Sequence, residues 1–389
     1  MNDAHRDEPR RTVVFDHFGE EGSRRLLTTP ALVCDHDLLI ENVARMATIT
    51  ALASVALRPH VKSHKSAYIA RLQLEAGATG LAFAKLSEAE AVIARLGDDG
   101  FPTRVSALLT SPLVGDALAR RAVRLSHHCD LTVVVDHLDG VDELTSAAQE
   151  ANATLSVLCD VDVGLARTGV TGASEALRVV ERIKASGRLR FDGVQGYGGH
   201  LQHVPGREER RHATKASTDR LRSVVQVLES EGHPVTLCTG GGTGTSQIDI
   251  ELGLLSELQC GSYVFMDREY RDALGDDVEG RFAQSLLIET TVISDLRETF
   301  VTADAGLKAM ATDADTPLVL GHDEVNYRFF GDEHGLVTRG FQNSFRRGDR
   351  LLLVPPHCDP TVDKYDLIWL VRGDVVVGVA DVVARGCSQ

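Results

Sequence analysis

The 389-residue sequence lacks the features of a nucleic-acid-binding or membrane protein. It has no basic excess, because 41 Lys and Arg residues stand against 56 Asp and Glu residues and the formal net charge is −15. A charge of this sign argues against nucleic acid or an anionic membrane as the main partner. No apolar run approaches the length of a membrane span, and the N-terminal MNDAHRDEPRRT has no apolar signal-peptide core. We therefore expect a soluble, cytoplasmic protein.

Paired cysteines are also missing. The seven cysteines form no CxxC pair, and they are odd in number and irregular in spacing. This pattern in a large chain predicts free thiols in a reducing compartment. Apolar residues make up 43% of the chain, so a full core can form. The length predicts one large domain with a smaller one, or two of comparable size.

From about residue 28 onward, short β-rich runs alternate with stretches of helical periodicity. The predicted strands are Ala31–Cys34, Ser54–Leu57, Gly80–Phe83, Val105–Leu109, Leu131–Val135, Thr154–Val161, Phe191–Gly196 and Val235–Cys238. The predicted helices are Asp37–Leu52, Ser66–Ala76, Ser87–Leu96, Pro112–Leu125, Gly140–Glu150, Gly172–Ala185 and Arg207–Glu231. Eight alternations favour an α/β fold with a (β/α)8, TIM-like barrel over an open doubly wound sheet. In such a barrel the active site lies at the C-terminal strand ends.

After about residue 275 the pattern changes. Segments such as FAQSLLIETTVISDL and YDLIWLVRGDVVVGVADVVAR are β-rich, with Gly and Asp turns and little helical periodicity. We expect a second, mostly antiparallel β domain here. The predicted division is a partly flexible leading segment that could join the β domain (residues 1–27), a barrel (28–270) and the β domain (271–389).

The segment RPHVKSHK, residues 58–65, concentrates titratable groups at a predicted strand end. Most lysines in such places are simply solvated. A lysine in a barrel mouth is partly desolvated, however, and its positive neighbours lower the amine's pKa further, which makes a nucleophilic Schiff-base lysine. If the strand geometry persists, Lys62 and His64 share one face and Lys65 points the other way. We therefore predict Lys62 as the reactive lysine.

Two glycine-containing segments follow later predicted strands. CTGGGTGT, residues 238–245, is either a flexible turn or a backbone cradle for an anion, and it matches neither a Walker A loop nor GxGxxG. CGSYVFMD, residues 260–267, offers further small N–H donors at Gly261 and Ser262. Late barrel strands often hold phosphate, which favours the anion interpretation.

Two more segments carry polar residues past a strand. Arg167 in CDVDVGLARTG is either a surface arginine or a pocket arginine that faces a phenolate or carboxylate. Tyr197 and His200 lie in QGYGGHLQH, which by itself reads as a glycine turn with a satisfied histidine.

His357 and Asp359 are two residues apart in PPHCDPTVDKYD. On an extended segment they project to one face as an N/O pair suited to a divalent cation, with Cys358 pointing away. A surface His and a surface Asp are the usual alternative, and two ligands alone are a weak signal.

Taken in order, RPHVKSHK, GLAFAKLSEAE, GYGGH, TGGGTGT and PPHCDPTV resemble the D-threonine aldolase / D-serine dehydratase family. These are fold-type III pyridoxal-phosphate enzymes related to alanine racemase. The resemblance runs from about residue 28 to 385 and is strongest to the D-threonine aldolase and 3-hydroxy-D-aspartate aldolase members. It implies a cofactor-holding barrel, a β domain that helps complete the active site, and a homodimer.

The resemblance also implies roles for individual residues. Lys62 would hold the cofactor as an imine, and Arg167 would lie near its phenolic oxygen. The residues implied around the ring and phosphate are Tyr197, His200, Gly242, Thr243, Gly261, Ser262 and Tyr270. Gln259 falls where alanine racemases keep an arginine opposite the pyridine nitrogen, which implies a weaker electron sink.

The family's metal position falls on His357 and Asp359. Dehydratase members resemble His-x-Cys, which suits zinc, whereas aldolase members resemble His-x-Asp, which suits Mn²⁺ or Mg²⁺. This chain has Asp359 at the second position. We therefore expect an aldolase that cleaves a small D-β-hydroxy-α-amino acid to glycine and an aldehyde. His64, His200 or a metal-bound hydroxide is the expected base.

Three alternatives stay open at this point. A D-serine or 3-hydroxyaspartate dehydratase would use the same groups. An amino-acid racemase would need a tyrosine from the β domain, and DAGLKAM, residues 304–310, offers none. A non-catalytic cofactor carrier would need neither the β domain nor the His-x-Asp pair. Glu333 and His334 either line the substrate entrance or lie in a solvated turn.

Overall fold

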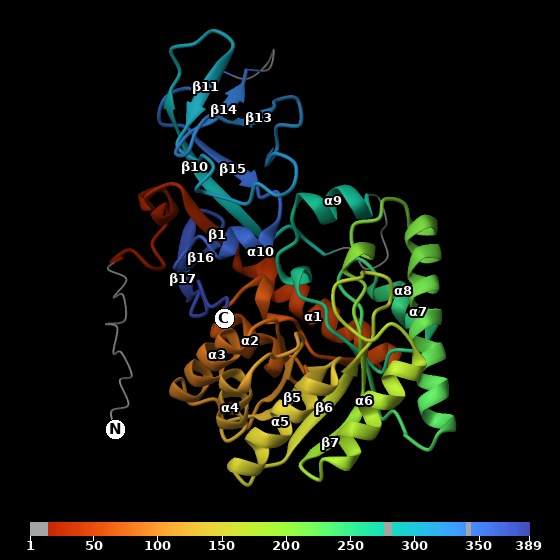
Figure 1. The fold of residues 1–389 in the computed structure, drawn as a ribbon. Helices are drawn as coiled ribbons and strands as arrows, with labels where there is room; N and C mark the ends of the chain where they lie inside the picture. Colours follow the sequence, from red (N-terminus) through yellow and green to blue (C-terminus); the bar gives the residue numbers. More distant parts are fainter. Residues whose placement is uncertain (1–14, 276–281, 340–343) are drawn as a thin grey trace.

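The computed structural model describes residues 15–275, 282–339 and 344–389. Figure 1 shows two bodies, a ring of strands and helices below and a β domain above. The lower body contains eight parallel strands in the order β2-β9-β8-β7-β6-β5-β4-β3. A bridge between His60 and Ala82 joins the two ends of this order. The predicted α/β class, with a barrel and a C-terminal β domain, is confirmed.

The strands of the barrel are short and are followed by helices. They are β2 (Ala56–Leu57), β3 (Leu81–Phe83), β4 (Ser106–Leu109), β5 (Asp130–Val135), β6 (Leu155–Asp160), β7 (Leu189–Gly196), β8 (Leu237–Gly240) and β9 (Glu257–Leu258). The helices are α1 (His36–Ala53), α2 (Ala67–Glu75), α3 (Leu86–Asp98), α4 (Asp116–Leu125), α5 (Leu138–Glu150), α6 (Ala173–Ala185), α7 (Arg207–Ser230) and α8 (Ser246–Leu252).

Helix α6 shows why these segments are helical. Its buried residues are Ala176, Val179, Val180 and Ile183, which recur at three- and four-residue spacing and form one apolar stripe. Glu175 in the first turn and Lys184 in the last complement the helix dipole. Burying each of the larger apolar side chains stabilises the fold by about 1.5–3 kcal/mol. No helix of the described residues is long and apolar enough to cross a membrane.

The first predicted barrel strand belongs elsewhere. β1 (Ala31–Asp35) pairs antiparallel with β10 (Leu286–Ser294) and parallel with β16 (Leu367–Arg372) in the upper sheet. The eighth barrel strand is β9, which has only two residues and was not predicted. The error arises because β1 is buried along its length, a pattern shared by a barrel strand and a central strand of a mixed sheet.

The β domain is built on a nine-stranded sheet with the path β13-β14-β11-β10-β1-β16-β17, and β15 and β12 lie off this path. The remaining strands are β11 (Phe300–Ala303), β12 (Leu318–Val319), β13 (Tyr327–Phe329), β14 (Gly335–Thr338), β15 (Arg350–Val354) and β17 (Val375–Asp381). The sheet is mostly antiparallel, as predicted, but the β1–β16 pair makes it mixed. Two short helices, α9 (Arg268–Leu274) and α10 (Cys358–Val362), lie between this sheet and the barrel (Figure 1).

The leading segment packs against the β domain from residue 15 onward. Gly19 N donates to Val376 O at 2.9 Å, and Arg24 pairs with Glu289 at 2.6 Å. Leu27 is buried in the small apolar cluster that contains Val371. The first part of the predicted leading segment of residues 1–27, residues 1–14, lies outside the described residues.

Candidate active site

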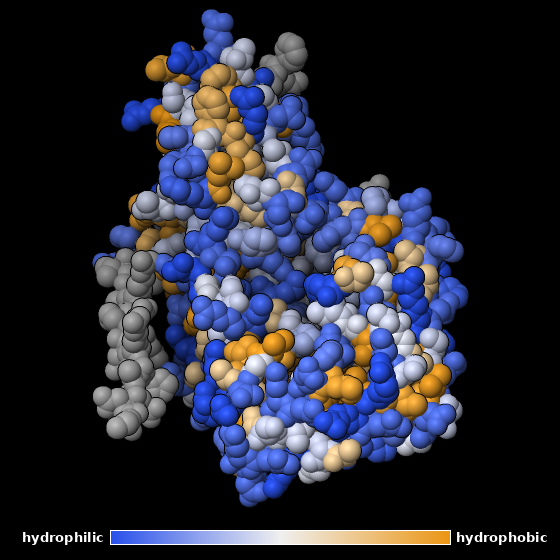
Figure 2. All heavy atoms as spheres, viewed as in Figure 1, coloured by the Kyte–Doolittle hydropathy of each residue, from blue (hydrophilic) through white to orange (hydrophobic). Residues whose placement is uncertain are grey.

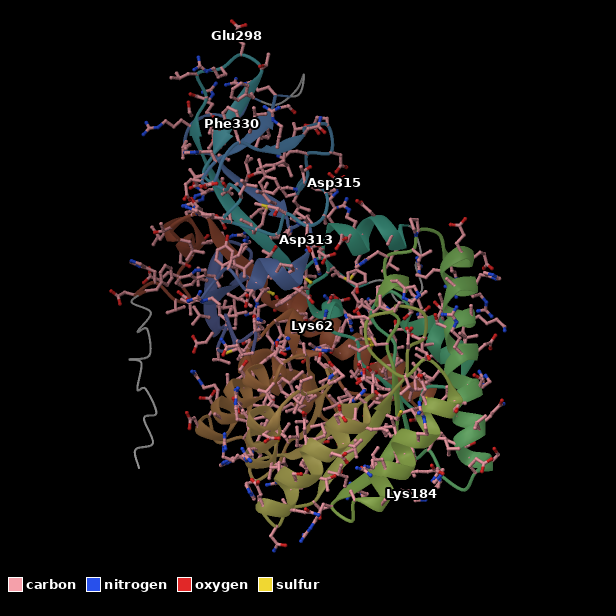
Figure 3. All side chains as sticks on the ribbon, viewed as in Figure 1. Lys62, Lys184, Glu298, Asp313, Asp315 and Phe330 are labelled. Atoms are coloured by element: carbon pink, nitrogen blue, oxygen red, sulfur yellow. The ribbon has the colours of Figure 1, made fainter. Side chains whose placement is uncertain are left out.

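Lys62 lies at the junction of the two bodies. Figure 2 shows the surface hollowed between the β domain and the barrel, with mostly hydrophilic residues around the hollow. Figure 3 places Lys62 at this junction, and Lys184 at the opposite end of the barrel. The C-terminal strand ends therefore face the β domain, as expected for a barrel active site.

The chain around Lys62 is not a strand. It turns at His60 into a 3-10 helix, η2 (Val61–Ser63), and His60 Nδ1 accepts a hydrogen bond from Lys62 N at 3.4 Å. The expectation that Lys62 and His64 share a strand face is therefore wrong. His64 is fully buried, where its Nε2 contacts Gln73 Oε1 at 3.2 Å and its Nδ1 accepts from Ser66 N.

The β domain brings a carboxylate directly to Lys62. Lys62 Nζ and Asp359 Oδ2 are 2.8 Å apart, and Asp359 lies in the first turn of α10. Lys65, the competing lysine, instead pairs with Asp363 at 2.6 Å. Lys62 and Asp359, which are 297 positions apart in the sequence, are therefore in direct contact.

This contact changes the ionisation of both groups. The negative charge of Asp359 raises the pKa of Lys62 above its usual range and outweighs the opposing effect of burial. The expectation that positive neighbours lower this pKa is wrong, because the charge of the Asp359 carboxylate, 2.8 Å away, has the largest effect on it. Burial alone would raise the pKa of Asp359, but the charges of Lys62 and His357 hold it below its usual range.

His357 is the last extended residue before α10, which begins at Cys358. The predicted extended His-Cys-Asp segment is therefore wrong. Cys358 does not point away from Asp359, since its Sγ donates to Asp359 Oδ1 at 3.3 Å. Its backbone N donates to Asp267 Oδ2 at 2.8 Å. This bond ties the start of α10 to α9, because Asp267 also caps that helix by accepting from Tyr270 N.

Acidic side chains surround His357. Its Nδ1 lies 2.9 Å from Asp313 Oδ2 and 3.7 Å from Glu269 Oε2. Burial lowers the pKa of His357, but Asp359 and Asp313 outweigh burial and the net pKa is raised. Within the described residues, no group of three or more His, Cys, Asp or Glu side chains could hold a metal ion. The described residues therefore offer a metal ion two neighbouring side chains, His357 and Asp359, rather than a set of three.

A histidine that the sequence analysis missed also faces this centre. Burial, followed by the positive charge of His357, lowers the pKa of His203 to about 4, and Asp359 and Lys62 also act on it. Its Nε2 is buried without a hydrogen-bond partner among the described residues. Its ring lies 4.4 Å from that of Tyr270 in an edge-on contact. A buried unpaired nitrogen requires an explanation, and a bound ligand is one.

His200, the histidine chosen from the same motif, is exposed and lies beside Gly164. The segment Gly199–Leu201, which includes His200, forms a 3-10 turn, η3, and His203 follows it. The ring of His203 packs against Tyr270. The sequence signal available for His203 was its presence in the same motif, QGYGGHLQH.

The glycine-rich loop is packed rather than open. Gly244 N donates to Gln202 Oε1 at 3.0 Å, and a Cβ on Gly242 would come within 2.4 Å of that oxygen. Part of the glycine run is thus required by Gln202, whose side chain is buried. Thr243 Oγ1 accepts from Tyr263 N at 3.1 Å, which joins the loop to η4 (Ser262–Val264).

Unused amide groups lie along this joined segment. The backbone N–H groups of Thr243, Gly261 and Ser262 donate to no acceptor among the described residues. A Cβ on Gly261 would lie 2.9 Å from His60 O, so this turn packs directly against the segment that carries Lys62. Free amides beside a lysine suit an anionic ligand.

The remaining expected residues lie at the barrel mouth or below it. Arg167 is exposed, with its guanidinium 5.6 Å from the Tyr197 ring. Gln259 is buried, and its Nε2 donates to Gln195 Oε1 and to Thr239 Oγ1, each at 3.1 Å. Gln195 in turn donates to Asp160 at 2.8 Å. The donors of Gln259 are thus engaged within the barrel.

Within this chain, the loop with Glu333 and His334 lies away from Lys62. Glu333 pairs with Lys308 at 2.5 Å in the turn between β13 and β14. Figure 3 labels Phe330, near the same turn, high on the β domain and far from Lys62.

Comparison with known proteins supplies the family. Residues 34–269 match the model "Alanine racemase, N-terminal domain", and residues 285–371 match "Putative serine dehydratase domain". The 3-hydroxy-D-aspartate aldolase of Paracoccus denitrificans (strain Pd 1222) is 35% identical over 92% of each chain. The D-threonine aldolase of an Arthrobacter species is 34% identical over 93% of each chain.

A solved structure agrees with these matches. D-threonine aldolase from Filomicrobium marinum superposes with a TM-score of 0.88 at 31% identity, over 94% of this chain and 97% of that chain. The family resemblance expected from the five sequence motifs is thereby confirmed.

Proposed function

Since this chain belongs to the family that joins an alanine racemase N-terminal domain to a serine dehydratase domain, we propose that it is an aldolase of D-β-hydroxy-α-amino acids. Its substrates would be D-threonine-like or 3-hydroxy-D-aspartate-like, and its products glycine and an aldehyde. The aldolases named above are carbon–carbon lyases of this kind. The observation that carries the proposal is the 2.8 Å contact between Lys62 and Asp359, which unites a barrel lysine with an oxygen ligand from the β domain.

The residues present fit the pyridoxal phosphate that the family implies. Lys62 supplies the amine, and the unused amides of Thr243, Gly261 and Ser262 supply donors for a phosphate. We assign Gly242, Tyr270, Tyr197, Arg167 and Gln259 to its surroundings, as the resemblance implies. When bound, this cofactor supplies an electron sink for the pair released by the broken Cα–Cβ bond.

The donor set also fits a divalent cation. His357 offers an imidazole and Asp359 a carboxylate, and a carboxylate contacts the other ring nitrogen of His357, as is usual for metal-bound histidines. Imidazole with carboxylate suits Mn²⁺ or Mg²⁺ better than a thiolate site would, and Zn²⁺ is the alternative ion. A cation held there supplies a Lewis acid that makes a substrate hydroxyl more acidic.

We propose His203 as the base in preference to His64 and His200. His203 is neutral at ordinary pH, because burial lowers its pKa to about 4, and its buried Nε2 has no other partner in the described part of the chain. This nitrogen takes the proton of the substrate's β-hydroxyl as the Cα–Cβ bond breaks and the aldehyde forms. Lys62, whose Nζ lies 2.8 Å from Asp359 at the same centre, supplies the proton that glycine gains at Cα.

The test uses full-length protein loaded with pyridoxal phosphate and then treated with a chelator. The absorption band of lysine-bound cofactor should vanish in Lys62→Gln and persist in the matched control Lys65→Gln, because Lys65 pairs with Asp363 instead. D-threonine and 3-hydroxy-D-aspartate should yield glycine, and added Mn²⁺ should increase the rate.

Other products would lead to other conclusions. Ammonia with a keto acid, without glycine, would replace the aldolase with a dehydratase, a reaction that the match to the serine dehydratase domain also allows. Glycine formation that is indifferent to Mn²⁺ would remove the metal from the proposal. Equal loss of the band in both lysine variants would refute the assignment of Lys62. The homodimer and the cytoplasmic location belong to the same proposal and need separate measurements.

A further inference from the structure

We propose that Asp313 is a positioning residue that orients His357, so that His357 Nε2 and Asp359 can bind a divalent cation together. The inference rests on the proposed metal site and adds a residue outside the His-x-Asp motif. Asp313 Oδ2 lies 2.9 Å from His357 Nδ1, which is hydrogen-bonding distance. Figure 3 shows Asp313 just above Lys62, at the junction of the β domain and the barrel.

The contact selects one tautomer of the imidazole. A carboxylate at Nδ1 accepts a hydrogen bond, so the proton stays on Nδ1 and the lone pair stays on Nε2. A metal ion needs that lone pair, and a carboxylate on the opposite nitrogen also makes the ligand more basic. Glu269 lies 3.7 Å from the same Nδ1, too far for a hydrogen bond. Asp313 is therefore the residue that fixes the ring.

The loop that carries Asp313 is itself held in place. Ala311 N donates to Thr361 Oγ1 at 2.9 Å, and this hydroxyl donates to His357 O at 2.7 Å. On the other side of Asp313, Arg268 Nη1 donates to the backbone carbonyl of Thr316. The loop is thus anchored to the helix that follows His357 and to the start of α9. Asp313 is held at a defined position by contacts on both sides.

Stabilisation of the fold does not account for this contact. The Asp313 side chain is 53% exposed, and ion pairs with so exposed a member add little to folding stability. A replacement at this position should therefore leave the protein folded. The same loop provides a matched control, because Asp315 has a carboxylate that is 68% exposed and pairs with Arg268 rather than with His357.

The test measures Mn²⁺ affinity by electron paramagnetic resonance on the full-length, cofactor-loaded protein without substrate. We expect Asp313→Ala to weaken Mn²⁺ binding by about 10–100-fold, the usual effect of losing an outer carboxylate. Asp313→Asn should weaken it less, because the amide oxygen can still accept from Nδ1–H. Asp315→Asn should leave the affinity unchanged, and His357→Ala should abolish binding.

The outcomes separate this inference from the function on which it rests. If His357→Ala abolishes Mn²⁺ binding but Asp313→Ala does not change it, the positioning role is refuted and the metal site stands. Equal weakening by Asp313→Ala and Asp315→Asn would also refute it, because the effect would then belong to the loop. If the wild-type protein binds no Mn²⁺, the proposed metal site and this inference both fail.

Discussion

The ion pair between Lys62 and Asp359 should slow the loading of the cofactor. Only the neutral amine can attack the cofactor aldehyde, and Asp359 keeps the Lys62 amine protonated by raising its pKa. Asp359→Asn removes the negative charge and keeps the size of the side chain. We therefore expect the variant to bind pyridoxal phosphate faster than the wild-type protein at neutral pH.

The size of the effect follows from the contact. Two unit charges about 4 Å apart interact by about 1 kcal/mol in water and by about 4 kcal/mol near a protein surface. The Lys62 side chain is 39% exposed and that of Asp359 is 14% exposed, so solvent screens the pair in part. We take about 1.4–2.8 kcal/mol, which is about one to two pKa units and about 10–100 times more neutral amine below both pKa values.

The assay follows the absorbance of the lysine-bound cofactor after mixing it with chelator-treated apoprotein at several pH values. Loading of Asp359→Asn should be about 10–100-fold faster near pH 7. The control is Asp363→Asn, which removes the partner of Lys65 and should leave the rate unchanged. A loading rate equal to or below that of the wild type, in a folded Asp359→Asn protein, would refute the reasoning.

Three further predictions concern the site and its support. The pKa of Asp359 is lower in the folded protein than the unfolded value of about 4, so the ionised carboxylate stabilises the fold above that pH and this stabilisation is lost as the pH falls. Asp359→Asn should therefore reduce the loss of stability below about pH 4, measured by denaturant melts. Gln202→Leu leaves Gly244 N without its acceptor, so it should lower the free energy of unfolding by about 1–3 kcal/mol in the same melts and weaken cofactor affinity. If both quantities stay unchanged, the packed loop is contradicted. His203→Gln should lower kcat by about 10²-fold or more with little change in cofactor absorbance, and an unchanged kcat would remove His203 as the base.

Much of the barrel could be predicted because its helices carry their own signal. α6 places Ala176, Val180 and Ile183 on one face through local spacing alone, and the predicted range 172–185 matches the observed helix to one residue. Prediction failed for β9, where two residues, Glu257 and Leu258, are too short a run to show any period. It also failed for β1, whose burial does not say which sheet it joins.

The candidate site shows the same limit at the level of side chains. The motif around His200 contained two histidines, and the choice between them depended on a 3-10 turn that the expected glycine loop did not suggest. Asp313 lies in no motif, because its relevance comes only from its distance to His357. Neither residue could be ranked before the two bodies of the molecule were packed together.

The sequence by itself determined the alternation of strands and helices, the position of Lys62 after a strand, and the choice of Asp359 over a cysteine two residues after His357. These features depend on neighbours along the chain and on residue type. The tertiary structure alone decided that Lys62 meets Asp359, since that contact joins positions nearly 300 residues apart. It exists because the β domain, built around the early strand β1 as well as the late strands, places α10 over the barrel mouth. Local periodicity carries no information about such packing.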